Sequence, residues 1–164
     1  MFENYKKQYE QIWKMFIRPY RQLYSHYDLG PKSRKINDKY VKRYDIDLKN
    51  DRNLILKCSY FEYFDSKSSY EASQVPDPAC KKPCLIYLHC NATSRLEGFE
   101  LLPFLVEANI HLFCFDFSGC GLSEGEYVSL GIYESQDLKA IVEYIRKNFG
   151  IKHIGFHSFH CKIF

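Results

Sequence analysis

Side chains that could carry out chemistry occur in two short stretches, each placed directly after an apolar run. His89-Cys90-Asn91 follows residues 84–88, and His157-Ser158-Phe159-His160-Cys161 follows residues 154–156. These residue types suit nucleophilic catalysis or metal binding. Open α/β sheets bind ligands at the carboxyl ends of buried strands, so we expect the first stretch, with His89 at its start, to border a site. The alternative is that His89 and Asn91 only cap the strand and bond to neighbouring loops.

A metal site is not expected from these residues. Zinc sites use closely paired ligands such as Cys-x-x-Cys, a spacing that the first of two candidate sets lacks, and the second set lies at a frayed terminus that gives no preorganised geometry. The two sets are Cys80, Cys84 and Cys90, and His157, His160 and Cys161. The chain has seven cysteines, an odd number, and two of them fall inside predicted strands. We therefore predict reduced thiols, no disulfide framework, no metal and no other cofactor.

The glycine-rich loop at residues 119–125 has the glycine content of a phosphate-binding loop but not its other features. It lacks the Lys-Ser/Thr pair of such loops, and no helix begins immediately after it. The carboxylates of Asp116 and Glu124 would repel phosphate. Nucleotide binding is therefore not predicted, and neither is a nucleic-acid partner.

Two short apolar runs, residues 84–88 and 112–115, lack the alternation of a half-exposed strand. This pattern is typical of strands covered on both faces, as in a parallel sheet. Between them, Ser94 and Glu97 have the spacing of a capping box, which predicts a helix that Pro103 kinks or restarts. The three elements form a predicted βαβ unit, and the glycine-rich loop follows its second strand.

The elements around this unit complete an α/β arrangement. Residues 40–48 and 54–64 predict a β-hairpin, and residues 66–82 read as a surface loop. A helix is predicted at residues 131–148 and a further strand at 153–156. Together these elements predict a hairpin that leads into a mostly parallel sheet with crossover helices.

The first 35 residues are basic, with eight Lys and Arg against three Asp and Glu, a net charge of +5. Residues 2–18 show helical apolar spacing and predict an amphipathic helix. We expect this helix to pack on the domain's own sheet; a solvated face, an acidic partner or contact with a membrane surface are the alternatives. No signal peptide or membrane span is recognisable, which predicts a cytoplasmic protein.

The βαβ unit, its His-Gly-Xaa-like turn and the stretch Asp116-Phe117-Ser118-Gly119-Cys120-Gly121-Leu122-Ser123-Glu124-Gly125 resemble the α/β-hydrolase superfamily. The nearest likeness is to its serine aminopeptidase-like and acyl-hydrolase-like branches. The resemblance covers residues 40–156 and implies a truncated α/β-hydrolase: a basic amphipathic lead segment at 1–39 and an incomplete hydrolase domain at 40–164. It makes the glycine-rich loop a structural turn beside the site.

The resemblance also implies roles for particular residues. The backbone N–H of Asn91 takes the position of an oxyanion-hole donor, with Cys90 where the family has glycine. The nucleophile position of the family's Gly-x-Ser-x-Gly elbow falls on His160, with Ser158 and Lys162 in the glycine positions. No Asp/Glu and His partners follow, so no catalytic residue is predicted.

Three functions remain open at this point. The first is a catalytically inactive fragment of a serine hydrolase that acts on an ester, thioester or peptide. The second is a non-catalytic binding module that uses the His89 turn or the basic helix. The third is a hydrolase that is active only when another chain completes it. A small-molecule or peptide substrate is expected where a full-length form exists.

Overall fold

The computed structural model describes residues 2–18, 20–78 and 82–158. Within these residues the strands form one mixed sheet in the order β1-β2-β3-β5-β4-β6. The strands are β1 (Ser33–Ile36), β2 (Lys39–Lys49), β3 (Ile55–Phe64), β4 (Cys84–Leu88), β5 (His111–Phe115) and β6 (Ile154–Ser158). Strands β1, β2, β3 and β5 pair antiparallel, whereas β4 runs parallel to both β5 and β6.

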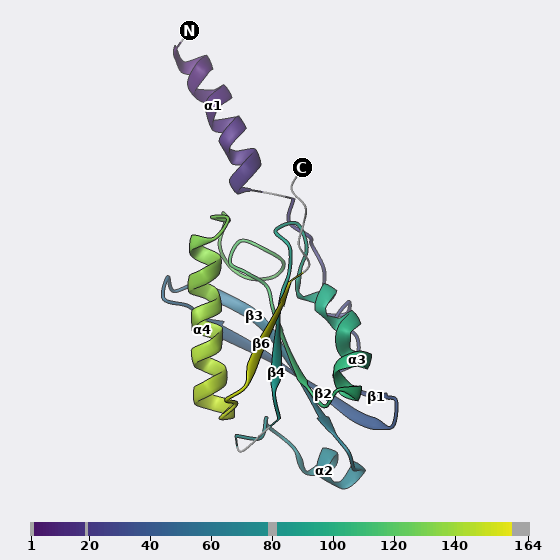
Figure 1. The fold of residues 1–164 in the computed structure, drawn as a ribbon. Coiled ribbons are helices and arrows are strands. Elements are labelled where there is room, and N and C mark those ends of the chain that lie inside the picture. Colours follow the sequence, from purple (N-terminus) through teal and green to yellow (C-terminus); the bar gives the residue numbers. More distant parts are fainter. Residues whose placement is uncertain (1, 19, 79–81, 159–164) are drawn as a thin grey trace.

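Helices cover both faces of this sheet (Figure 1). The helical elements are α1 (Phe2–Ile17), α2 (Lys67–Ala72), the 3-10 helix η1 (Arg95–Leu101), α3 (Leu102–Glu107) and α4 (Ile132–Phe149). Ile141 and Ile145 of α4 belong to one buried apolar cluster, and Leu102 and Val106 of α3 belong to another. Successive strand residues alternate between the two clusters, as in a sheet buried on both sides.

The predicted fold class is confirmed. The β2–β3 hairpin, the buried strands β4 and β5, helix α4 and strand β6 all form within a few residues of the predicted positions. The structure adds β1, which pairs with β2, and α2, which lies inside the stretch predicted to be only a loop. The side chain of Ser66 caps α2 by accepting the N–H of Ser69 at 3.2 Å.

The predicted capping box at Ser94 is wrong. The Ser94 hydroxyl makes no capping hydrogen bond, and Glu97 accepts from the Thr93 hydroxyl at 2.9 Å. The Asp116 carboxylate, at the end of β5, instead accepts the N–H of Arg95 at 2.8 Å. A carboxylate from another element, and not the Ser94 side chain, therefore accepts a backbone N–H in the first turn of the helix. The chain forms η1 and restarts as α3, with Pro103 in the first turn as predicted.

The prediction that the amino-terminal helix packs on the sheet is also wrong. Helix α1 forms as expected but projects away from the sheet (Figure 1). Tyr5, Tyr9 and Ile12 are 65%, 70% and 58% exposed. Near its end α1 meets the domain, because the carbonyl of Ile17 accepts the N–H of Val128 at 2.8 Å. None of the helices in the described ranges is long and apolar enough to cross a bilayer.

Candidate functional site at the carboxyl ends of the parallel strands

Strand pairing brings the turn at residues 89–91 beside the end of β6. Strand β4 lies between β5 and β6, and Leu88 of β4 pairs in register with Ser158 of β6. The turn after β4 and the loop after β5 therefore lie at one edge of the sheet, where open α/β sheets bind ligands. Ser158 is exposed, whereas His160, Cys161 and Lys162 lie outside the described residues.

His89 is buried, and both of its ring nitrogens are engaged. Its Nε2 accepts the backbone N–H of Phe117 at 3.0 Å, so Nδ1 carries the proton and donates to the carbonyl of Cys90 at 2.7 Å. Burial lowers the pKa of His89, which favours the neutral ring that this arrangement requires. The side chain thus ties the turn after β4 to the loop after β5, and its Nε2 is not open to take a proton from a substrate.

The backbone of the turn is held by further contacts. The carbonyl of Cys90 accepts both the N–H and the hydroxyl of Thr93, each at 3.0 Å. The thiol of Cys120 donates to the carbonyl of Asn91 at 3.5 Å. Cys90 is not among the residues with positive φ, so a side chain at this position causes no backbone strain. The predicted oxyanion donor, the N–H of Asn91, therefore belongs to a turn that hydrogen bonds hold from two sides.

Asp116 organises the base of the site. Its carboxylate is fully buried and accepts the Arg95 N–H at 2.8 Å, the Leu122 N–H at 2.9 Å and the Tyr24 hydroxyl at 2.6 Å. The buried guanidinium of Arg95 lies 3.9 Å from the carboxylate and donates through Nε to the same Tyr24 hydroxyl at 2.7 Å. Burial, with the Asp116 charge as the next cause, raises the pKa of Tyr24 and keeps it a neutral donor. The buried charge of Asp116 is thus paired and hydrogen-bonded.

A second buried carboxylate holds the same loop from helix α4. Asp137 accepts the Ser118 N–H at 2.9 Å, the side-chain amide of Asn50 at 2.7 Å and the guanidinium of Arg52 at 2.7 Å. Arg52 also lies over the ring of Tyr133, with its Cζ 4.0 Å from the ring centroid. The loop after β5 is therefore preorganised by acids from two elements, as the expectation of a structural turn beside the site requires.

Sequence reasoning located the turn and the loop but missed the side chains that join them. The sequence indicates Asp116 only as a group that would repel phosphate and as the first residue of the glycine-rich stretch, and it gives no role to Tyr24, Arg95 or Asp137. One local signal existed for each acid: Asp116 ends an apolar strand, and Asp137 precedes the buried positions of an amphipathic helix. A buried acid at such a position needs partners, but the pattern does not name them.

Comparison with solved structures defines the class of fold. An esterase from Pyrococcus furiosus, Pf2001, matches 87% of this chain and 47% of its own chain, with a TM-score of 0.62 and 23% sequence identity. An α/β hydrolase from Penicillium sp. sh18, GrgF, matches 71% of this chain and 37% of its own, with a TM-score of 0.53 and 17% identity. The chain therefore has an α/β-hydrolase-like fold and covers less than half the length of these proteins.

The matches found by sequence cover a shorter part of the chain than the structural matches do. The uncharacterized protein YfhR of Salmonella typhimurium is 36% identical over 62 residues, which are 38% of this chain and 20% of that protein. YfhR of Salmonella typhi matches to the same extent. No family model matches the chain.

Proposed function

We propose that this chain supplies the oxyanion side of a serine-hydrolase site of the serine aminopeptidase-like type, and that the 164 residues do not hydrolyse a substrate by themselves. The reaction of the whole site would be acyl transfer from an ester, thioester or peptide, with the N–H of Asn91 stabilising the oxyanion. The nucleophile, its base and the orienting acid would come from residues beyond those described or from another chain.

The observation that carries this proposal is the pairing of Leu88 with Ser158. It sets the turn at residues 89–91 directly beside the strand end from which a nucleophile elbow would begin. The neutral His89 ring and the Cys120 thiol hold this turn in place without offering a base of their own. Burial raises the pKa of the Cys120 thiol to about 12, so this thiol is no nucleophile at neutral pH.

Activity measurements test the first half of the proposal. The purified chain is incubated with a fluorophosphonate probe and, separately, with p-nitrophenyl butyrate. We expect no labelled serine and no turnover above a heat-denatured control, because a serine without a paired base is a weak nucleophile. Turnover together with labelling of Ser158 or any other serine would show that the chain is itself an enzyme.

A turn transplant tests the oxyanion role. The sequence of residues 89–91 replaces the corresponding turn of the Pf2001 esterase, and the Asn91 position is then changed to Ala or to Pro. The Asn91→Ala form keeps the backbone N–H and should retain esterase activity, whereas Asn91→Pro removes the donor and should lose on the order of 100-fold in kcat. If the Asn91→Ala and Asn91→Pro hybrids both fold and are equally active, the N–H of Asn91 is not an oxyanion donor.

A second role is proposed for the exposed helix α1. Tyr5, Tyr9 and Ile12 recur at helical spacing and are exposed, and the lysine side chains of the same helix include exposed Lys6. Isolated helices of this length are marginal in water, so an exposed apolar face requires a partner surface. Aromatic residues together with lysines suit the interface of an anionic membrane, and we propose that α1 lies on such a surface.

A further inference from the structure

Strand β6 is an outermost strand of the sheet and pairs with β4 alone among the described strands (Figure 1). The N–H of Cys84 in β4 donates to the carbonyl of His153 at 3.0 Å, so the carbonyl of His153 points toward β4. The direction of the main-chain groups alternates from one residue to the next along a strand. The N–H and C=O groups of Ile154, Phe156 and Ser158 therefore face outward, away from β4.

The other edge of the sheet is guarded against strand pairing, whereas the edge at β6 is not. Strand β1 has four residues, and two of them, Arg34 and Lys35, are cationic. An identical strand set against β1 would bring like charges together, which is a common protection of sheet edges. Strand β6 has five residues without Asp, Glu, Lys or Arg, and Phe156 is 55% exposed. The β6 edge is thus open to a further strand.

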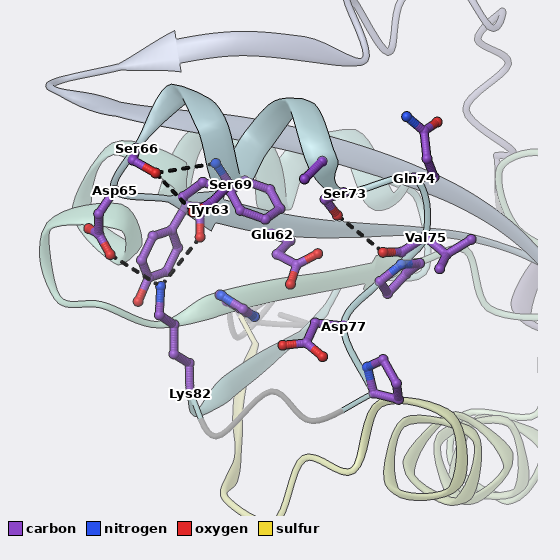
Figure 2. A pocket seen from close by; sticks show the side chains of 15 residues that line it. Glu62, Tyr63, Asp65, Ser66, Ser69, Ser73, Gln74, Val75, Asp77 and Lys82 are labelled. Atoms are coloured by element: carbon purple, nitrogen blue, oxygen red, sulfur yellow. Dashed lines mark hydrogen bonds and ion pairs between the residues drawn. The ribbon is translucent and has the colours of Figure 1, made fainter.

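Polar groups elsewhere on the margin of the sheet are satisfied within the chain. Beside the cavity of about 760 Å³ next to α2, Lys82 lies 3.7 Å from the Asp65 carboxylate and donates to the carbonyl of Tyr63 at 3.4 Å (Figure 2). The hydroxyl of Ser73 donates there to the carbonyl of Val75 at 3.1 Å. By contrast, no strand in the described ranges covers the outer edge of β6. An open edge of this kind is a template for strand addition.

The outward residues of β6 are arranged symmetrically about Phe156. In an antiparallel pair of two copies with the two-fold axis at Phe156, this residue lies opposite Phe156 of the second copy, and Ile154 lies opposite Ser158. Each opposed pair of outward residues exchanges two N–H···O=C bonds, which gives about six bonds in total. Strand β6 is therefore complementary to itself in length, register and charge.

The side chains support the same pairing. Ile154 packs against the buried cluster that contains Ile141 and Ile145 of α4. Phe156 is two residues further along β6 and lies on the same face of the sheet. Across the two-fold axis, the Phe156 rings of two copies would form an aromatic cross-strand pair. This pair would continue the apolar layer between α4 and the sheet from one copy into the next.

We propose that two copies of this chain associate through their β6 edges and form one continuous sheet across an antiparallel β6–β6 pair. A second copy fits this edge because it brings a strand of equal length that buries no charge. Two strands of five residues cover less than the roughly 1,200 Å² of a stable interface, so the dimer forms with a dissociation constant in the micromolar range. The interface does not rest on the acyl-transfer role proposed above, and its test needs no substrate.

Sedimentation velocity of the purified chain over a range of concentrations, under reducing conditions, tests this interface. We expect a reversible monomer–dimer equilibrium. Phe156→Lys sets two cations opposite one another at the two-fold axis and should weaken dimerisation about tenfold or more, and Phe156→Glu should do the same with two anions. An equimolar mixture of these two variants should form a heterodimer, because opposite charges then face each other. Phe104→Lys alters an exposed aromatic residue on α3 and should change the dissociation constant less than about twofold.

Amide hydrogen exchange of the wild-type chain gives a second readout that needs no substitution. The N–H groups of Phe156 and Ser158 should be protected at high protein concentration and should exchange faster on dilution. The N–H of Gly155 faces β4 and should be protected at both concentrations. This measurement decides the question if Phe156→Lys or Phe156→Glu fails to fold, judged by circular dichroism.

Several results would overturn the proposal. These are a monomer at every concentration, a dimer that Phe156→Lys leaves unchanged, an equal loss in Phe104→Lys, and a mixture of the Lys and Glu variants that stays monomeric. Outward N–H groups of β6 that remain protected in the monomer would show that the chain's own residues cover this edge. A dimer that is lost on changing Tyr9 and Ile12 to Ser, but not in Phe156→Lys, would assign the association to α1 instead.

Discussion

Arg21 donates through Nε to the carbonyl of Gly121 at 2.7 Å, although the two residues are 100 positions apart in the chain. The same guanidinium reaches the carbonyls of Gly125 at 3.2 Å and Cys120 at 3.4 Å, and also that of Ser123. One side chain from the lead segment thereby satisfies several carbonyls of the glycine-rich loop. The planar fork of donors makes arginine suited to this task.

Replacing Arg21 by Lys should lower the free energy of unfolding by about 1–3 kcal/mol. A lysine keeps the charge but cannot reach several carbonyls from one plane, so some of them lose their donor. Urea denaturation followed by circular dichroism measures the change. Lys32→Ala removes an exposed charge from the same lead segment and should stay within about 0.5 kcal/mol of wild type. Equal effects of the two substitutions would contradict a specific clamp.

Replacing Gly121 by Ala should destabilise the fold more than replacing Gly131 by Ala. Gly121 has a φ of +46°, and an added Cβ would lie 2.3 Å from the carboxyl carbon of Asp116, whose position three donors hold. We expect a loss of about 3 kcal/mol or more, or failure to fold. Gly131 also has positive φ, at +145°, but a Cβ there meets nothing within 4 Å, so Gly131→Ala isolates the backbone strain at about 1–2 kcal/mol. Thermal melts of both variants test this order.

Stability should fall in mild acid because of buried neutral histidines. Burial, assisted by the charge of Lys82, lowers the pKa of His111 to about 3 in the folded chain, against about 6.5 when unfolded. Between pH 3 and pH 6.5 the unfolded chain binds more protons than the folded chain does. The free energy of unfolding therefore keeps its full value above pH 6.5 and decreases as the pH falls. At pH 5, His111 should account for about 2 kcal/mol of lost stability. The lowered pKa of His89 acts in the same direction.

Urea denaturation at pH 7 and at pH 5 checks this dependence. The hydroxyl of Tyr60 lies 2.6 Å from Nδ1 of His111, so His111→Phe will lower stability at both pH values. The difference in the free energy of unfolding between pH 7 and pH 5, however, should be smaller for His111→Phe than for wild type by about 2 kcal/mol. An unchanged difference would mean that His111 does not titrate with folding.

Flotation with anionic vesicles tests the membrane role of α1. Vesicles of phosphatidylserine and phosphatidylcholine should carry the chain upward at low salt, and the double change Tyr9→Ser with Ile12→Ser should abolish flotation. Gln8→Ser with Gln11→Ser alters exposed polar positions of the same helix and should leave flotation unchanged. Flotation that is absent in wild type, or that survives loss of the apolar pair, would argue against a lipid surface.

The local elements of this fold were predictable because their signals are local. Uninterrupted apolar runs predicted β4 and β5, and alternation predicted the β2–β3 hairpin, since burial on one or both faces requires a pattern within a few residues. The same reasoning placed the His89 turn at a strand end. It could not find β1, whose four residues are at most half-buried and carry no strong pattern.

The sequence by itself determined most of the strands and helices, though not β1 or α2, together with the class of fold and the stretch of chain that would border a site. Only the tertiary structure decided what each polar group does there. His89 is held neutral by the N–H of Phe117, Ser94 loses its capping role to Asp116, and Arg21 and Tyr24 contact a loop about 100 residues away. A buried polar group must be satisfied, but the partner that satisfies it is chosen by the packing of distant elements, which no local pattern records.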